Sequence, residues 1–285
     1  MAEQALLVEG SEARAYFSLL TAARGGEGGD VGGGVGGGFD TTRLGSAVLL
    51  RCSAVRSTLL VNRVLGLGID GPASAADIEH IVNWYAGEGL PFGVELSPAA
   101  QPVELPEWLR SKRLRKSFPT QVLLRGGEPP PPHYEPWARM TGLRVEAVGP
   151  EHAATVARLS CQNFQMPAEI GHLLTVGSQA PGWRRWLALD GAEPVGASLS
   201  YVEGGICWLG WTSVLASHRG RWVHAGIVAK QLQDAHDARC QWVTTETAVS
   251  SAQKPDAAHF NLCKFGFVDA YLRPVYVFAP PRPRP

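Results

Sequence analysis

The segment 210–247 reads GWTSVLASHRGRWVHAGIVAKQLQDAHDARCQWVTTET. The apolar run 207–214 is typical of a strand, and it leads into a polar turn, 218–222, that carries two arginines around a glycine. A helix is expected from about Val223, and a second strand over 241–245. This order suits a phosphate-bearing ligand, because backbone N–H groups and the positive end of a helix dipole would face the anion.

Length and charge limit what the chain can do. With 285 residues it is long enough for two domains. Its 26 basic residues equal its 26 acidic residues, so the formal net charge is zero. That balance argues against nucleic acid or an anionic membrane as a partner. No apolar run approaches the roughly 20 residues that cross a bilayer, and no basic region typical of a secretory signal precedes an apolar run at the start.

The cysteines give no sign of a metal or a disulfide framework. There are five, scattered through the chain, and none forms a C-x-x-C pair. We therefore expect reduced thiols in a cytoplasmic protein, without a bound metal.

Two stretches divide the chain. The first, GGEGGDVGGGVGGG at 25–38, is expected to be a flexible loop, since no Gly-Lys-Ser/Thr follows it to make a P-loop. The second begins at 126 and contains four consecutive prolines, which favour an extended connection. The predicted division is a domain at 1–125, a linker at 126–143, a domain at 144–279 and a disordered tail at 280–285.

Local signals predict several element boundaries. Ser11 is a plausible N-cap for a helix over 12–23, and Ser74 for a later helix with acids in its first turns. Residues 59–64 are expected to form a strand. Asp190-Gly191 is a hairpin signal between two strand-like runs.

Three landmarks of the second half resemble the GNAT superfamily of acyltransferases. Residues 187–196 resemble its strand–turn–Val-Gly–strand hairpin, 212–226 its strand, pyrophosphate loop and helix start, and 261–267 its Asn…Gly-Phe helix ending. The matched region covers about 145–278. The resemblance implies an α/β fold, with a central, mostly antiparallel sheet flanked by helices.

The first half resembles a degenerate copy of the same fold. Asn62-Arg63-Val64-Leu65-Gly66-Leu67-Gly68, a helix and then 92–96 follow in the family order, but no Arg-Gly-x-Gly loop is present. We expect a tandem GNAT protein whose first half does not bind CoA. The alternative is a single GNAT domain after an unrelated N-terminal domain.

The resemblance assigns roles to residues of the second half. Acetyl-CoA would be the co-substrate, with pantetheine inserted beside a strand that diverges from its neighbour. Glu246 is the first candidate for a general base, and a structural carboxylate is the alternative. The residues expected to contact CoA are Ser213, Val214, Leu215, Arg219, Gly220, Arg221, Trp222, His224, Ala225, Gly226 and Asn261.

Three positions depart from the family pattern. Trp222 stands where the family loop has its first glycine, and His224 where it has a small residue. A shifted register would make Gly226 the last small residue instead. Leu262 stands where a tyrosine often protonates the leaving thiolate.

We therefore expect an acyl-CoA-dependent N-acyltransferase that acts on a small-molecule amine by direct attack on the thioester. One alternative is a GNAT-like binding or regulatory protein, with Trp222 blocking the pyrophosphate site. Another is an acyl-thioester hydrolase or decarboxylase on the same fold.

Overall fold

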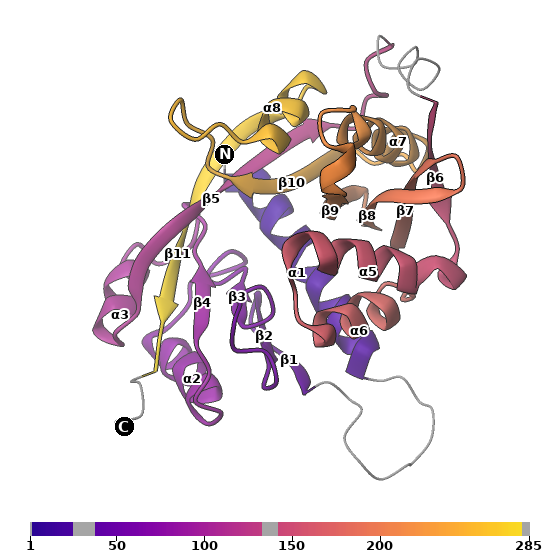
Figure 1. The fold of residues 1–285 in the computed structure, drawn as a ribbon. Coiled ribbons are helices and arrows are strands. Elements are labelled where there is room, and N and C mark those ends of the chain that lie inside the picture. The colour runs from indigo at the N-terminus through magenta and orange to yellow at the C-terminus, as the bar shows by residue number, and fades with distance from the viewer. Residues whose placement is uncertain (1, 25–37, 133–141, 281–285) are drawn as a thin grey trace. The chain divides into compact units, whose positions relative to one another are not determined.

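The computed structural model describes residues 2–24, 38–132 and 142–280 (Figure 1). The expected flexible loop, apart from Gly38, lies outside the described residues, as do 133–141 of the expected linker and 281–285 of the expected tail.

The chain divides into two compact units. Unit 1 is 1–120 together with 271–285, and unit 2 is 121–270. This division differs from the expected contiguous domains, because the chain passes from one unit to the other within two strands, β5 and β11. The elements that begin in unit 1 are α1 (Ala2–Arg24), β1 (Phe39–Leu44), β2 (Ala47–Cys52), β3 (Arg63–Leu65), α2 (Ala75–Ala86), β4 (Phe92–Glu95), α3 (Leu105–Ser111) and β5 (Arg115–Gly126).

Unit 2 holds the remaining elements. They are β6 (Leu143–Val148), η2 (Pro150–His152), α5 (Ala153–Phe164), α6 (Ala168–Gly177), β7 (Trp183–Asp190), β8 (Glu193–Glu203), β9 (Ile206–Val214), η3 (Ala216–His218), α7 (Val223–Asp237), β10 (Trp242–Ala248), α8 (Ala257–Lys264) and the start of β11 (Val268–Phe278). Helices α5 and α6 lie on one side of the strands and α7 on the other (Figure 1).

The strands of the two units are arranged in a similar way, with one parallel pair in each. The order is β1-β2-β3-β4-β11 in unit 1 and β5-β10-β9-β8-β7-β6 in unit 2. In each unit one pair is parallel, β3 with β4 and β9 with β10, and a helix connects the two strands, α2 and α7 respectively. The other described pairings are antiparallel.

Two local predictions fail and two succeed. Ser11 does not cap a helix, because α1 runs through it from Ala2 to Arg24. The expected strand over 59–64 is wrong for 59–62, where the Asn62 side chain bonds to Cys52 N and Val55 O and replaces strand pairing. Ser74 caps α2, and Asp190-Gly191 joins β7 to β8 as a hairpin.

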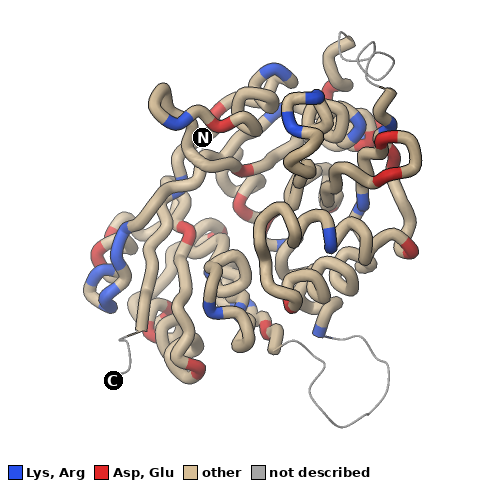
Figure 2. Tube along the Cα trace, viewed as in Figure 1, with Lys and Arg blue, Asp and Glu red and all other residues tan. Residues whose placement is uncertain are grey.

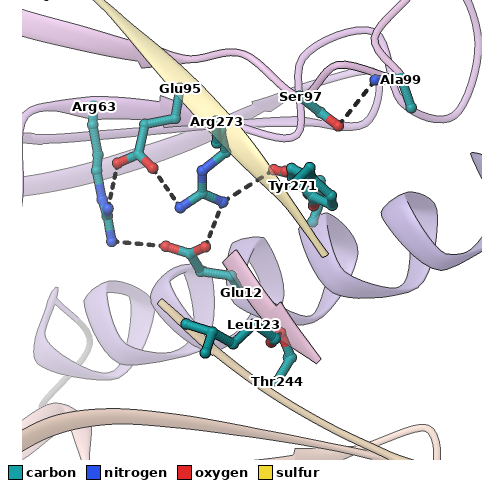
Figure 3. A network of polar contacts seen from close by, with 10 residues as sticks. Glu12, Arg63, Glu95, Ser97, Ala99, Leu123, Thr244, Tyr271 and Arg273 are labelled. Atoms are coloured by element: carbon teal, nitrogen blue, oxygen red, sulfur yellow. Dashed lines mark hydrogen bonds and ion pairs between the residues drawn. The ribbon is translucent and has the colours of Figure 1, made fainter. Parts of the chain in front are cut away.

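A closed ring of buried charges joins four elements of unit 1 (Figure 3). Arg273 of β11 contacts Glu12 of α1 at 2.7 Å and Glu95 of β4 at 2.5 Å. Arg63 of β3 contacts Glu12 at 3.1 Å and also pairs with Glu95. All four side chains are at most 6% exposed. The ring therefore fixes β11 to elements that lie far from it in the sequence.

Glu9 adds a third carboxylate to these two guanidinium groups. It lies 3.2 Å from Arg273 Nη1 and accepts a 2.7 Å hydrogen bond from the Tyr271 hydroxyl. Burial raises the pKa of Glu9, against the effect of Arg273 and with that of Glu12. Three acids and two guanidinium groups thus meet within unit 1.

Charges outside this cluster are mostly mixed in sign along each unit (Figure 2). The exception is the turn from α3 into β5, where five basic residues fall within 110–116. No helix in the described part of the chain has the length and apolar character to span a membrane.

Replacing Arg273 by leucine should lower the free energy of unfolding by about 3–5 kcal/mol, because it leaves three carboxylates buried with a single guanidinium. Urea unfolding followed by circular dichroism measures this. The matched control is Arg24→Ala, which breaks an ion pair in which the arginine is 62% exposed and should cost less than about 1 kcal/mol. Equal effects of the two variants would contradict the role given to the ring.

Glu9→Gln should instead leave stability at neutral pH unchanged or raised. The folded pKa of Glu9 is above its ordinary value of 4.5, so its contribution is fully present below that value and is lost as pH rises through the folded pKa. Glutamine imitates the protonated acid and has no such loss. Unfolding free energies measured from pH 4 to pH 8 should therefore show the variant gaining on the wild type as pH rises. If the unfolding free energy of the variant fell relative to that of the wild type as pH rises, this prediction would be wrong.

Candidate active site

The site begins where two parallel strands of unit 2 stop pairing. β9 and β10 pair at three positions, the last being Trp208 with Thr244. Thr245 then donates its hydroxyl to Leu209 O at 2.9 Å, so a side chain takes the place of a backbone bond. Beyond this point β9 continues to Val214 and β10 to Ala248 without backbone pairing between their described residues. Backbone pairing therefore ends in the region where the strands were expected to diverge.

A bulge in β9 accompanies this divergence. The β8–β9 register shifts so that Leu199 faces Gly210 while Ala197 faces Ser213, which inserts one extra residue into β9. Trp211, inside the bulge, has a φ of 59°. A bulge bends its strand and increases its twist.

Polar side chains satisfy the carbonyl groups that the bulge releases. Ser160 of α5 donates to Trp211 O at 3.2 Å, and Ser198 of β8 lies 3.2 Å from Gly210 O. Ser198 also accepts from Gln231, a fully buried residue of α7. The bulge is thus held from both faces of the strands.

The loop after β9 leads to a helix start without a side-chain cap. Gly220 has a φ of 75°, and Trp222 has a φ of 64°, immediately before α7. No acid occupies the first turn of α7. Among the described residues, the N–H groups of 222–225 have no hydrogen-bond acceptor. Such N–H groups and the helix dipole favour an anion at this end.

The N–H of Gly226 is not part of this set. It donates to Trp222 O at 3.0 Å as the first bond of α7. This amide is therefore already hydrogen-bonded within the helix. Ala225 and Gly226 are both buried at the base of the helix.

The cations of the loop are held by acceptors that the sequence did not suggest. His218 Nε2 lies 3.2 Å and Arg221 Nη1 3.1 Å from the Asp190 carboxylate at the end of β7. The His218 hydrogen bond, followed by Arg221, lowers the pKa of Asp190. Arg219 donates to Asn163 Oδ1 of α5 at 2.6 Å. The sequence predicted Asp190 only as a turn residue, and it gave no indication that Asn163 would contact the loop.

The side chain of Trp222 lies beside α8. Its ring is 5.2 Å from Lys264 Nζ, which also lies 4.3 Å from the ring of Phe260. Trp222 and Phe260 are 47% and 59% exposed. The conformation at Trp222 is the left-handed one that glycine adopts most easily.

His224 and Asn261 meet between α7 and α8. Asn261 Nδ2 lies 3.4 Å from His224 Nδ1. Desolvation by burial lowers the pKa of His224 to about 4, with Asp256 acting in the opposite direction. A neutral imidazole at this helix start can accept or donate a hydrogen bond but brings no charge to an anion.

The remaining predicted residues lie along the diverging strands. Glu246 is half-buried on β10, two residues beyond the last paired position. Ser213 is buried on β9, and its hydroxyl has no hydrogen-bond partner among the described residues. Val214 ends β9, and Leu215 N donates to Val195 O at 2.9 Å.

The equivalent place in unit 1 is closed. Ser74 and Asp77 form a capping box at the start of α2, which places an acid in its first turn. Gln101 N donates to Gly68 O at 2.7 Å, and Ala73 N donates to Gln101 O at 2.9 Å. These bonds tie the loop after β3 to the segment after β4, so the two connections meet instead of separating.

Comparison with solved structures returns proteins that match almost the whole chain. A GCN5-related N-acetyltransferase from Kribbella flavida has a TM-score of 0.61 at 14% identity, over 97% of this chain and 96% of that one. A tandem GNAT protein from the clavulanic acid biosynthesis pathway has a TM-score of 0.58 at 14% identity, over 95% and 96%. A GCN5-related N-acetyltransferase from Sphaerobacter thermophilus has a TM-score of 0.54 at 12% identity, over 94% and 93%.

No family model and no curated protein sequence matches the chain. At these identities, structural similarity shows the fold and not the activity. The expected architecture, with helices flanking mostly antiparallel sheets, is confirmed. The chain has the fold of the GNAT superfamily.

Proposed function

We propose that the protein is an acyl-CoA-dependent N-acyltransferase whose site lies in unit 2, with acetyl-CoA as the acyl donor. One observation carries the proposal. Of two helices that follow equivalent strands, α2 is capped by Ser74 and carries Asp77, whereas α7 has no side-chain cap and no acid in its first turn. Only the second arrangement suits a pyrophosphate group.

The donor would follow the elements in the order in which they leave the strands. Pantetheine would lie along Ser213, Val214 and Leu215, where β9 has lost its partner. The pyrophosphate would lie at the N–H groups of 222–225, with Gly220 and the guanidinium groups of Arg219 and Arg221 nearby in the loop. Asn261 and His224 would border this path from α8 and α7.

The reaction would be direct attack of an amine on the thioester carbonyl. Backbone N–H groups near the bulge would stabilise the charge on the carbonyl oxygen. Glu246 would accept the proton of the attacking amine, directly or through water. The aliphatic side chain of Leu262 has no ionisable proton, so the leaving thiolate would take its proton from another source.

The acceptor would be a small amine and not a nucleic acid. Arg221 is paired with Asp190, and Arg219 is hydrogen-bonded to Asn163. The equal numbers of basic and acidic residues in the chain also argue against a nucleic acid. The protein is proposed to act in the cytoplasm.

A second candidate function is ligand binding or regulation without transfer. The observation that favours it is Trp222, whose bulk replaces the glycine of the family loop. Its ring lies beside Lys264 of α8, which argues that the amides of the helix start stay accessible.

Calorimetry with acetyl-CoA tests the donor site. The wild type should bind with a dissociation constant of about micromolar order, and Trp222→Gly should change it by less than about tenfold, because the ring lies against α8. Ser74→Ala, which changes the start of the equivalent helix α2, is the matched control and should bind like the wild type.

Two outcomes would end the donor-site proposal. Binding by Trp222→Gly but not by the wild type would mean that the tryptophan closes the site, and would support the binding or regulatory alternative. Binding by neither protein would remove the assignment of this loop to CoA.

Glu246→Gln tests the chemistry separately. With an amine panel and detection of released thiol, kcat should fall by roughly 10²- to 10⁴-fold while acetyl-CoA affinity is unchanged. A parallel loss of affinity would show that Glu246 is structural. Thiol release by the wild type without an amine would instead support the hydrolase alternative.

A further inference from the structure

Three side chains with metal-binding donor atoms meet at the C-terminal end of unit 2. They are His259 and Cys263 of α8 and Asp269 at the start of β11. One donor atom from each residue lies within 4.8 Å of the other two. His259 and Cys263 are four residues apart, which places them on one face of the helix. The turn at Gly266, with a φ of 86°, reverses the chain and brings Asp269 back to that face.

The distances are close to those of a metal site. His259 Nε2 is 2.7 Å from Asp269 Oδ1, and Cys263 Sγ is 3.9 Å from each ring nitrogen. Donors around a tetrahedral zinc ion lie roughly 3.5 Å apart, given metal–ligand bonds of about 2.0–2.3 Å. The sulfur needs little movement, and only the hydrogen bond between imidazole and carboxylate has to open.

We propose that His259, Cys263 and Asp269 bind a transition-metal ion, with Zn²⁺ as the best fit and water in the fourth position. A nitrogen, a sulfur and an oxygen donor match zinc, whereas magnesium and calcium prefer oxygen donors alone. On binding, the Cys263 thiol releases its proton to solvent as the metal–sulfur bond forms. His259 takes the tautomer with its proton on Nδ1, so that Nε2 faces the metal.

The surroundings favour entry of an ion. Cys263 is exposed, and the side chains of His259 and Asp269 are 19% and 53% exposed, so no unfolding is needed. Asp256 accepts from His259 N at 2.7 Å and fixes the start of α8. Lys264 follows Cys263 in sequence but is directed to the rings of Trp222 and Phe260.

The same geometry argues against a nucleophilic cysteine. Desolvation, followed by Asp269, raises the pKa of the Cys263 thiol. Without a metal the sulfur is therefore held as a thiol, which is a weak nucleophile. The sequence predicted no metal because it offered no paired cysteines. Here the donor set consists of a single cysteine, a histidine one helical turn before it and a carboxylate after the turn at Gly266.

The site would also constrain the helix that borders the proposed donor path. α8 carries Asn261, which contacts His224 at the start of α7. His259 and Cys263 lie on either side of Asn261 in this short helix, so a metal that binds them would limit its movement.

Titration of the reduced protein with Co²⁺ tests the site without any assay of activity. Cobalt bound to the thiolate should give a charge-transfer band in the near ultraviolet and tetrahedral bands in the visible, and Zn²⁺ should remove both by displacement. Cys263→Ser should abolish the charge-transfer band. His259→Ala and Asp269→Asn should each weaken Co²⁺ binding by at least about tenfold, since loss of even an outer-sphere partner costs that much.

Cys161→Ser is the matched control, because this half-buried thiol is elsewhere in unit 2. It should leave both bands unchanged, and far-ultraviolet circular dichroism establishes that each variant is folded. The proposal fails if the wild type gives no charge-transfer band or if the band survives in Cys263→Ser. A band that depends on Cys263 but not on His259 or Asp269 would also overturn it, because it would report a lone thiol.

Discussion

The candidate site depends on one interruption in backbone pairing, the loss of hydrogen bonds between β9 and β10 after Trp208 and Thr244. A continuous parallel pair would leave no strand edge for a ligand to use. The extra residue at Trp211 bends β9, and buried serines on α5 and β8 satisfy the carbonyls that the bend exposes. The position at which β9 ends then determines where the loop places the start of α7. The bulge is a structural cost, placed beside the strand edge that the proposed acyl donor would use.

The two units show how one fold can keep or lose such an opening. Both have a parallel pair crossed by a helix, but in unit 1 the loop after β3 is bonded to Gln101 and the helix start is satisfied by Ser74 and Asp77. In unit 1, the backbone groups that could bind a ligand at this place are hydrogen-bonded within the protein. In unit 2 the corresponding amides of 222–225 face no internal acceptor among the described residues. The difference lies in a few polar residues and not in the topology.

Much of this could be predicted from the sequence, because it rests on local chemistry. The cap at Ser74, the hairpin at Asp190 and the order strand–turn–helix–strand each follow from residues adjacent in the chain. What failed involves partners distant in sequence. The acidic face of α1 around Ser11 looked like a helix start, since nothing nearby reveals that it is buried against arginines from β3 and β11. Asn163 and the second role of Asp190 were missed for the same reason.

The ring of charges around Arg273 also sets an order of events. Residues 271–278 complete unit 1, yet they follow every residue of unit 2 in the chain. On the ribosome, therefore, unit 2 can collapse first, while the earlier-made Glu12, Arg63 and Glu95 wait for the arginine that neutralises them. Until then Glu12 and Glu95 lack the ion pairs with Arg273, and the edge of β4 that pairs with β11 is unpaired. The half of the protein that is synthesised first is the half that matures last.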